Sequence, residues 1–329
     1  MFGRMEDSLR DLQRAMAAHR KALAANRMLP GEDAAMRQRV MHRLTRDIER
    51  ISGIEITEMI EGKLARVLSS VAIDELERWA RRLHVLPGND PEWLSLIESL
   101  TVHETFFHRD RAQLALLGQI LPELAIAAAR SGRRRLRLWS AGCATGEEAY
   151  TLAILALRAL RDAGFADQSP DGGIVCRAPW QLDVLGTDIS RLVLTQARAA
   201  IYSTEGLSAF RDLPHEFQRF FPILPKSRES GEIERRGVLP AVRRHVRFRQ
   251  FNLLAALPPE TECDVVLCRN VLIYLTAAAR RDAQAVFRQA LRPGGYLLLG
   301  PTDTVADPTA YEVRWGTGAA AYALRPRDE

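Results

Sequence analysis

The sequence predicts an α/β fold in which a parallel sheet carries helices on both faces and follows an all-helical region. Two patterns support this prediction. Residues 1–130 contain many helical patterns and no convincing strand, whereas short apolar strands alternate with helical stretches from Arg133 onward. Such alternation is typical of parallel sheets with right-handed crossovers. The chain has 329 residues, which is long enough for two domains.

Turn signals divide the helical region into separate helices. The first amphipathic segment, residues 9–23, has leucines near helical spacing, and Pro30-Gly31 follows it. Gly53 and the turn at residues 87–91 supply later breaks. We expect the remaining helices of this region at residues 33–52, 57–69, 73–84 and 91–101.

The second region contains the alternating elements in order. Proline and glycine mark some boundaries, for example where Pro293-Gly294-Gly295 stops a helix. Strands are expected at residues 134–141, 181–188, 246–254, 263–270 and 296–302. Helices are expected at residues 146–162, 190–200 and 276–291, and a final hairpin at 311–324. Residues 201–245 interrupt the alternation and predict an inserted subdomain, with 226–237 as an exposed turn between two of its strands.

Composition argues against several classes of protein. Apolar residues make up 47% and charged residues 26% of the chain, and no stretch of about 18 apolar residues occurs, so we expect no membrane span. The N-terminus lacks the apolar core of a secretion signal, which predicts a cytoplasmic location. The four cysteines are scattered, which argues against a metal site or a disulfide framework. The net charge of +5 comes from arginines spread over helical surfaces, so nucleic-acid binding is not expected.

A loop of small residues follows the first expected strand. Residues 141–146 are Ala-Gly-Cys-Ala-Thr-Gly, and Glu147 and Glu148 come next. In a doubly wound sheet, ligands bind at the carboxyl ends of the strands, and small residues let the backbone approach them closely. A tight strand-to-helix turn without a ligand is the alternative that this pattern alone leaves open.

Three cofactors compete for this loop. A phosphate-binding loop needs GxxxxGK[ST], but no lysine follows Gly146. A nicotinamide-binding loop needs GxGxxG and an acid about 20 residues later, whereas Asp188 lies 42 residues after Gly146. S-adenosylmethionine carries no phosphate, and its ammonium group and ribose diol suit carboxylates beside a loop of small residues. The loop therefore fits S-adenosylmethionine best.

Six segments in order resemble one enzyme family. The segments LWSAGCATGEEAYTLAI and DVVLCRNVLIYL are similar to two signatures of the CheR-type chemotaxis protein-glutamate O-methyltransferases. The segments HETFFHRD, LGTDIS, FNLL and LRPGGYLLLG resemble four further motifs of that family. The resemblance covers roughly residues 53–324 and implies a small all-α domain followed by a Rossmann-like methyltransferase domain with an inserted antiparallel β-subdomain. The expected divisions are a helical extension at 1–45, a helical domain at 46–130 and the methyltransferase domain at 131–329, with its insertion at 201–245.

The resemblance also implies roles for particular residues. Glu148 and Asp188 would hold the methionine ammonium and the ribose hydroxyls, while Asn252 and Leu253 would flank the adenine. The implied cofactor-binding residues are His103, Thr105, Arg109, Gly142, Glu148, Asp188, Asn252, Leu253, Arg269 and Asn270. Arg109 and Tyr274 are the implied catalytic residues, and no metal is implied.

The implied reaction is methyl transfer from S-adenosylmethionine to glutamate side chains of a chemoreceptor, which forms methyl esters in chemotaxis adaptation. A glutamate has a pKa near 4.3, so the acceptor is ionised at neutral pH and needs no strong general base. The implied partner is the cytoplasmic domain of the receptor. We expect the enzyme to be a monomer that does not insert into the membrane.

Several positions depart from the family pattern. His103 and His108 replace an asparagine and a phenylalanine, and GPTDT at residues 300–304 stands where GHSES is usual. The segment at 53–77, which is densely basic in receptor-docking members, holds two basic residues and six acids. Two alternatives therefore stay open, namely methylation of another signalling protein and a catalytically weak cofactor-binding docking module. A nucleic-acid methyltransferase is disfavoured, because the Asn-Pro-Pro-aromatic motif is absent.

Overall fold

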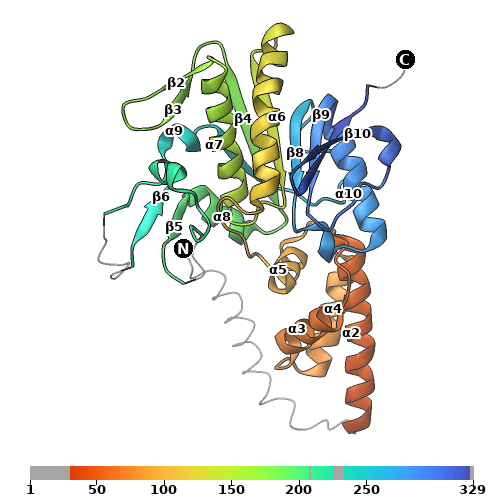
Figure 1. Cartoon of the computed structure of the whole chain (residues 1–329). Coiled ribbons are helices and arrows are strands. Elements are labelled where there is room, and N and C mark those ends of the chain that lie inside the picture. The colour runs from red at the N-terminus through yellow and green to blue at the C-terminus, as the bar shows by residue number, and fades with distance from the viewer. Residues whose placement is uncertain (1–29, 207–208, 226–232, 327–329) are drawn as a thin grey trace. The chain divides into compact units, whose positions relative to one another are not determined.

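The computed structural model describes residues 30–206, 209–225 and 233–326 (Figure 1). The chain divides into two compact units, Met1–Leu100 and Thr101–Glu329. The amphipathic helix expected within the first 29 residues lies outside the described residues. Most of the exposed turn expected at 226–237 also lies outside them.

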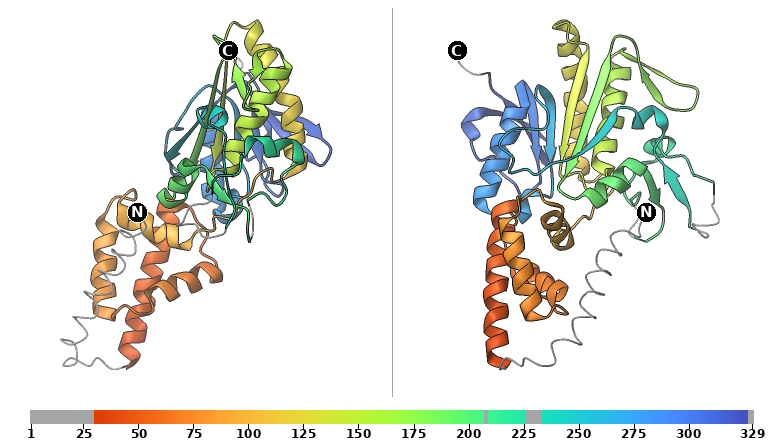
Figure 2. Two further views of the ribbon diagram at one scale, coloured as in Figure 1. Left: turned by 90° about the vertical axis from the view of Figure 1, so that its left-hand side faces the viewer. Right: turned by 180° about the vertical axis from the view of Figure 1, so that it is seen from behind.

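The described part of the first unit is helical (Figure 2). Its helices are α2 (Pro30–Ser52), α3 (Glu58–Leu68), α4 (Ile73–Val85) and α5 (Pro91–Leu100). The Thr57 side chain caps α3 by accepting a hydrogen bond from the Ile60 N–H group. The side chains of Leu44 and Trp93 are fully buried, and Trp93 Nε1 donates to the Leu83 carbonyl at 2.9 Å. All four helices that turn signals predicted for this part of the chain are therefore present.

The second unit is organised around a seven-stranded sheet in the order β10-β11-β9-β8-β1-β4-β7. The strands are β1 (Arg135–Ala141), β4 (Gln181–Asp188), β7 (Val246–Gln250), β8 (Cys263–Cys268), β9 (Leu291–Leu299), β10 (Tyr311–Gly316) and β11 (Ala319–Leu324). The five neighbouring strands β9, β8, β1, β4 and β7 are parallel to one another. At the β9 edge, β11 and β10 extend the sheet as an antiparallel hairpin. The predicted parallel sheet and the predicted final hairpin are both confirmed.

Helices cover both faces of this sheet (Figure 1). They are α6 (Arg111–Arg130), α7 (Glu147–Asp162), α8 (Arg191–Ala199), α9 (Pro240–Arg243) and α10 (Ala277–Ala290). Successive side chains of β1 point to opposite faces of the sheet, so two neighbouring residues show what covers each face. Leu138 belongs to the core that contains α6 and α7, whereas the Trp139 ring packs against Phe287 of α10. The α/β architecture expected from the sequence is confirmed.

Helix α6 belongs to the second unit, which corrects the expected domain boundaries. We expected the helical domain to extend to residue 130, but the units divide after Leu100, and α6 packs against α7, β1 and β11. The expected boundary at residue 45 falls inside α2. By length and composition, α6 is the one helix in the described part of the chain that is apolar enough to cross a membrane. Its apolar residues, including Leu117 and Ile120, are buried in the core of this unit.

The order of the strands creates a switch point between β1 and β8. The chain passes from β1 to β4 and β7 at one side of the sheet, and then returns to form β8 and β9 on the other side. The loops that follow β1 and β8 therefore leave the sheet in opposite directions. Ligands of open α/β sheets bind in the crevice outside the carboxyl ends of such strands.

The predicted insertion lies between α8 and β7. It contains a short antiparallel pair, β5 (Ile201–Ser203) and β6 (Arg235–Gly237), and a 3₁₀ helix, η2 (His215–Phe220). Three of its aromatic rings surround the buried ring of Phe107, namely those of Tyr202, Phe210 and Phe221. The segment before α6 is thus fixed to the insertion. A further small hairpin, β2 (Ala166–Gln168) and β3 (Ile174–Cys176), was not predicted.

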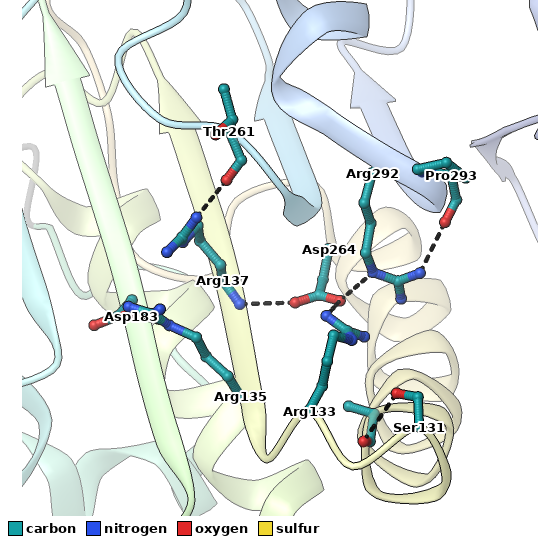
Figure 3. Close-up of polar contacts among 10 residues, drawn as sticks. Ser131, Arg133, Arg135, Arg137, Asp183, Thr261, Asp264, Arg292 and Pro293 are labelled. Carbon is teal, nitrogen blue, oxygen red and sulfur yellow. Dashed lines mark hydrogen bonds and ion pairs between the residues drawn. The ribbon is translucent and has the colours of Figure 1, made fainter. Parts of the chain in front are cut away.

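A buried carboxylate joins the amino ends of β1 and β8 (Figure 3). The side chain of Asp264 is 1% exposed. Its Oδ1 atom accepts hydrogen bonds from Arg133 at 3.1 Å and from Arg292 at 2.5 Å. Its Oδ2 atom accepts from the backbone N–H group of Arg137 at 2.8 Å. This network stabilises the edge of the sheet that lies opposite the carboxyl ends.

Replacement of Asp264 by asparagine is expected to lower the free energy of unfolding by about 2 kcal/mol, because hydrogen bonds to charged groups contribute about 1.5–3 kcal/mol each. Chemical denaturation measures this change. Asp183→Asn is the matched control, since Asp183 pairs with Arg135 at the same edge while both side chains are partly exposed. That control should lose less than about 1 kcal/mol. Equal losses in the two variants would contradict a special role for Asp264.

Candidate active site

The loop after β1 lies against two neighbouring segments. Gly142 has a φ angle of +80°, and a Cβ atom there would lie 2.4 Å from Cγ2 of Val271. Gly146 has a φ angle of +95°, and a Cβ atom there would lie 2.9 Å from a neighbouring methyl group. Both positions therefore require glycine. The N–H groups of Gly142 and Cys143 donate to the Thr187 carbonyl at 2.8 Å, which joins this loop to the end of β4.

Asp188 ends β4 and is hydrogen-bonded to the same loop. Its Oδ2 atom accepts from the Ala144 N–H group at 2.9 Å, and its Oδ1 atom accepts from the Ser190 N–H group at 3.0 Å. Burial raises the pKa of Asp188, while these two N–H groups and the nearby His103 oppose the rise. Each carboxylate oxygen keeps a second lone pair. Asp188 can therefore also accept hydrogen bonds from the hydroxyl groups of a ligand.

The segment before α6 carries three of the expected site residues. The His103 ring lies close enough to Asp188 to influence its charge, and His103 Nε2 is hydrogen-bonded to the Thr101 hydroxyl at 2.8 Å. The Arg109 guanidinium donates to the Glu104 carbonyl at 3.0 Å. The Thr105 side chain is half-buried. The structure thus brings His103 near Asp188 at the end of β4, whereas the half-buried Arg109 side chain is hydrogen-bonded within its own segment.

Arg269 is buried among the site residues, and its side chain is 2% exposed. Its Nε atom donates to Glu148 Oε2 at 2.7 Å, and the other Glu148 oxygen accepts from the Ser140 hydroxyl at 2.7 Å. A terminal nitrogen of Arg269 donates to the Arg109 carbonyl at 2.9 Å and lies 3.6 Å from the Asp110 carboxylate. Arg269 therefore joins the loop after β8 to the start of α7 and to the segment before α6.

Three residues close to this arginine have left-handed backbone conformations. They are His108, Asp110 and Asn270, with φ angles of 61°, 59° and 58°. Histidine, aspartate and asparagine are the side chains that tolerate this conformation best after glycine. The His108 N–H group donates to the Thr151 hydroxyl at 3.3 Å, and burial lowers the pKa of His108. The unusual histidine at position 108 is therefore compatible with its sharply turned backbone.

The loops after β7 and β8 supply the remaining expected residues. The Phe251 N–H group donates to the Asp188 carbonyl at 2.9 Å, which places Asn252 and Leu253 beside the end of β4. Tyr274 lies in a 3₁₀ turn, η3 (Leu272–Tyr274), and is 40% exposed. The loops after β1, β4, β7 and β8 all leave the carboxyl ends of parallel strands. The expected residues that these loops carry therefore gather at one edge of the sheet.

Glu147 is a buried carboxyl group that the sequence did not single out. The residue is 3% exposed, and its Oε2 atom accepts from the Thr145 hydroxyl at 2.6 Å. The Thr145 carbonyl accepts from the Tyr202 hydroxyl at 2.8 Å, which links the loop to the insertion. Burial raises the pKa of Glu147 to about 7. The adjacent Glu148 has the same residue type, so no feature of the sequence distinguishes the two.

The raised pKa of Glu147 predicts that the protein loses stability as the pH rises. An unfolded glutamate titrates near pH 4.3, so the folded state binds this proton more tightly and its stabilising effect is complete below that pH. The effect is lost as the pH rises through about 7. Between pH 5 and pH 8 the free energy of unfolding of the wild type should fall by on the order of 3 kcal/mol because of Glu147. In Glu147→Gln this fall should be absent, as measured by chemical denaturation at each pH. Glu123→Gln, at an exposed ion pair, should retain that loss, and equal pH slopes in wild type and Glu147→Gln would contradict the prediction.

These features match the requirements of one cofactor. The two glycines of the loop after β1 let a ligand approach the backbone closely, and the carboxylate of Asp188 stands at the end of β4. Two further carboxylates follow the loop at the place where a phosphate-binding loop has lysine. The described residues contain no cluster of three or more histidine, cysteine, aspartate or glutamate side chains placed to hold a metal ion. A doubly wound sheet with this loop defines the class of S-adenosylmethionine-dependent methyltransferases.

Comparison with known proteins gives the family. Residues 103–317 match the family described as CheR methyltransferase, SAM binding domain. The match covers more than half of the chain, so the chain belongs to the CheR methyltransferases. S-adenosylmethionine is therefore its cofactor, and methyl transfer is its reaction.

Similar curated proteins include several named for chemotaxis. The chain is 31% identical to Chemotaxis protein methyltransferase 1 of Pseudomonas aeruginosa, over 78% of this chain and 85% of that protein. It is 30% identical to Chemotaxis protein methyltransferase Cher2 of Pseudomonas putida, over 78% of this chain and 87% of that protein. It is also 32% identical to Probable biofilm formation methyltransferase WspC of Pseudomonas aeruginosa, over 74% of this chain and 51% of that protein.

Proposed function

We propose that this methyltransferase modifies glutamate side chains of a methyl-accepting chemoreceptor and forms glutamate methyl esters in chemotaxis adaptation. The observation that carries this proposal is the identity of 31% to a chemotaxis protein methyltransferase over 85% of its length. The partner we propose is the cytoplasmic domain of the receptor, and the enzyme acts on it as a cytoplasmic monomer.

The proposed cofactor contacts follow from the positions of the side chains at the carboxyl edge of the sheet. Asp188 accepts from the ribose hydroxyls, and Glu148, which both Arg269 and Ser140 hold in place, binds the methionine ammonium. Asn252 and Leu253 flank the adenine. The remaining cofactor-binding residues that we propose are His103, Thr105, Arg109, Gly142, Arg269 and Asn270.

The proposed chemistry relies on orientation instead of proton removal. The bound cofactor supplies an electrophilic methyl group on its sulfonium. The acceptor is already an anion at neutral pH, because a glutamate has a pKa near 4.3. The protein therefore has to align the carboxylate with the methyl group and exclude water. We assign the orientation of the acceptor charge to Arg109 and the placement of the methyl group or substrate to Tyr274.

Transfer of a labelled methyl group into membranes that contain chemoreceptors tests this function. We expect label on the receptor, and we expect mild base to release it as methanol, because carboxylate methyl esters hydrolyse readily. A reaction with the Asp188→Asn variant is the negative control. Base-stable label would contradict the glutamate ester, and label only on proteins other than receptors would contradict the receptor as the acceptor.

Another signalling protein in a chemosensory-like pathway is the second candidate for the acceptor. The identity of 32% to a probable biofilm formation methyltransferase supports it. Helix α3 also presents Glu58 and Glu61 in its first turn and only Lys63 and Arg66 as basic residues, so acidic receptor helices gain little attraction from it. Parallel labelling of membranes that contain chemotaxis receptors and of cell extracts that lack them separates the two candidates. Label on the chemotaxis receptors alone would exclude this second candidate.

A further inference from the structure

Two backbone carbonyls on either side of Tyr274 share one guanidinium group. The Nε atom of Arg280 donates to the Leu275 carbonyl at 2.8 Å, and one terminal nitrogen donates to the Ile273 carbonyl at 3.4 Å. The internal hydrogen bonds of this 3₁₀ turn use other carbonyls, those of residues 271 and 272. A turn of three residues has few hydrogen bonds of its own, so these two charge-assisted bonds form a large part of what fixes it.

Arg280 is itself held by a regular helix. It lies in the first turn of α10, and its N–H group donates to the Thr276 carbonyl at 2.9 Å. The Thr276 hydroxyl caps the same helix by accepting from the Ala279 N–H group at 3.2 Å. Side chains of a helix point toward its N-terminus, which is the direction of the Tyr274 turn. The guanidinium therefore braces the turn from a rigid support.

A carboxylate of the GPTDT segment lies near the same guanidinium. Burial raises the pKa of Asp303, and the positive charge of Arg280 opposes that rise. The Oδ2 atom of Asp303 is buried and has no hydrogen-bond partner among the described residues. A Cβ atom on Gly300 would lie 2.7 Å from that oxygen and 3.1 Å from the backbone nitrogen of Asn270. Arg280 thus stands between the loop after β9 and the turn after β8.

The Tyr274 side chain depends on this support. The ring is 40% exposed, so neighbouring side chains restrain it only in part. The place of the ring therefore depends largely on the backbone of the turn. We propose that Arg280 is a positioning residue for methyl transfer, which holds the turn so that Tyr274 faces the reacting groups. This inference rests on the role proposed above for Tyr274.

Kinetics of the full-length enzyme test the proposal. Arg280→Gln should lower kcat about 10- to 100-fold, because small displacements of a reacting geometry have effects of this size. Its Kd for S-adenosylmethionine should stay within about twofold of wild type, since the proposed cofactor contacts lie elsewhere. Arg281→Gln is the matched control, because Arg281 is the exposed neighbour in the same helix, and its kcat should not change. Arg280→Lys should recover part of the rate, since an ammonium group still reaches a carbonyl. A normal kcat in Arg280→Gln, or a loss confined to Kd, would overturn the proposal.

A double-mutant cycle with Tyr274→Ala separates positioning from general stability. If Arg280 acts through Tyr274, adding Arg280→Gln to Tyr274→Ala should change kcat by less than about threefold. Additive losses would show that Arg280 acts independently of Tyr274 and would refute the inference. A fully active Tyr274→Ala variant would refute it as well.

Hydrogen exchange supplies a measurement that needs no acceptor protein. The backbone amides of Tyr274 and Leu275 should exchange about tenfold faster in Arg280→Gln than in Arg281→Gln, because the turn opens more readily. Unchanged exchange would overturn the proposal. If the wild-type enzyme labels no receptor, the proposed acceptor fails, whereas the exchange rates still decide whether Arg280 braces the turn.

Discussion

Asp188→Asn is expected to weaken the binding of S-adenosylmethionine by about 100-fold or more, as measured by titration calorimetry. Both carboxylate oxygens of Asp188 accept backbone N–H groups, from Ala144 and from Ser190. An asparagine oxygen replaces one acceptor, but its amide nitrogen then faces the other N–H group. The charge that would bind two ribose hydroxyls is lost as well. Hydrogen bonds to charged groups contribute about 1.5–3 kcal/mol each, which gives a factor of about 10² to 10⁴ for two.

The control for this variant lies on the same strand. Asp183→Asn makes the same chemical change at the amino-terminal half of β4, where Asp183 pairs with Arg135. Its affinity for S-adenosylmethionine should equal that of the wild type. A Kd for Asp188→Asn within about threefold of this control would remove Asp188 from the cofactor site, since even one charged hydrogen bond is worth more.

Arg269→Met should lower the free energy of unfolding by about 3–5 kcal/mol, because it leaves a buried carboxylate without its cation. Glu148 is 11% exposed, so water cannot replace the lost guanidinium fully. The Arg109 carbonyl also loses its donor, and the segment before α6 is released from the loop after β8. We therefore expect methyl transfer to fall below detection in this variant. Chemical denaturation and the labelled-methyl assay measure the two effects.

Two further variants test the cause of this loss. Arg177→Met removes an exposed arginine paired with Asp167, and should lose less than about 1 kcal/mol. Adding Glu148→Gln to Arg269→Met removes the uncompensated charge and should restore part of the stability. If the double variant is less stable than Arg269→Met alone, the buried ion pair is not the cause.

Most of the fold was predictable from local pattern. Strands such as Gln181–Asp188 are short apolar runs between turn signals, and helix Ala277–Ala290 ends three residues before the proline that was expected to stop it. The domain boundary was not predictable in this way. No separate helix was predicted at residues 111–130, which were assigned only to the helical region, and a helical pattern does not say that α6 packs against α7 and β11. The hairpin of β2 and β3 was missed because each of its strands has only three residues.

The candidate site was predictable where a motif carried it. The glycine loop follows one strand that the sequence predicts and Asp188 ends another, and the parallel arrangement places the two strand ends together. The contacts that hold the site were not predictable, because they join distant residues. Arg269 and Glu148 are separated by 121 positions, and nothing in the sequence pairs them. Arg280 lies near Tyr274 in the sequence, but the direction in which its side chain points depends on where α10 begins.

The left-handed corners at His108, Asp110 and Asn270 bend the chain before any ligand arrives. Each such conformation costs on the order of 1 kcal/mol or more for a residue other than glycine, and the free energy of folding already includes that cost. A cofactor bound at the proposed site would therefore meet a neighbouring backbone that folding has already ordered. Preorganisation of this kind raises affinity without any additional contact. The binding entropy of S-adenosylmethionine should accordingly contain only a small contribution from ordering of the protein.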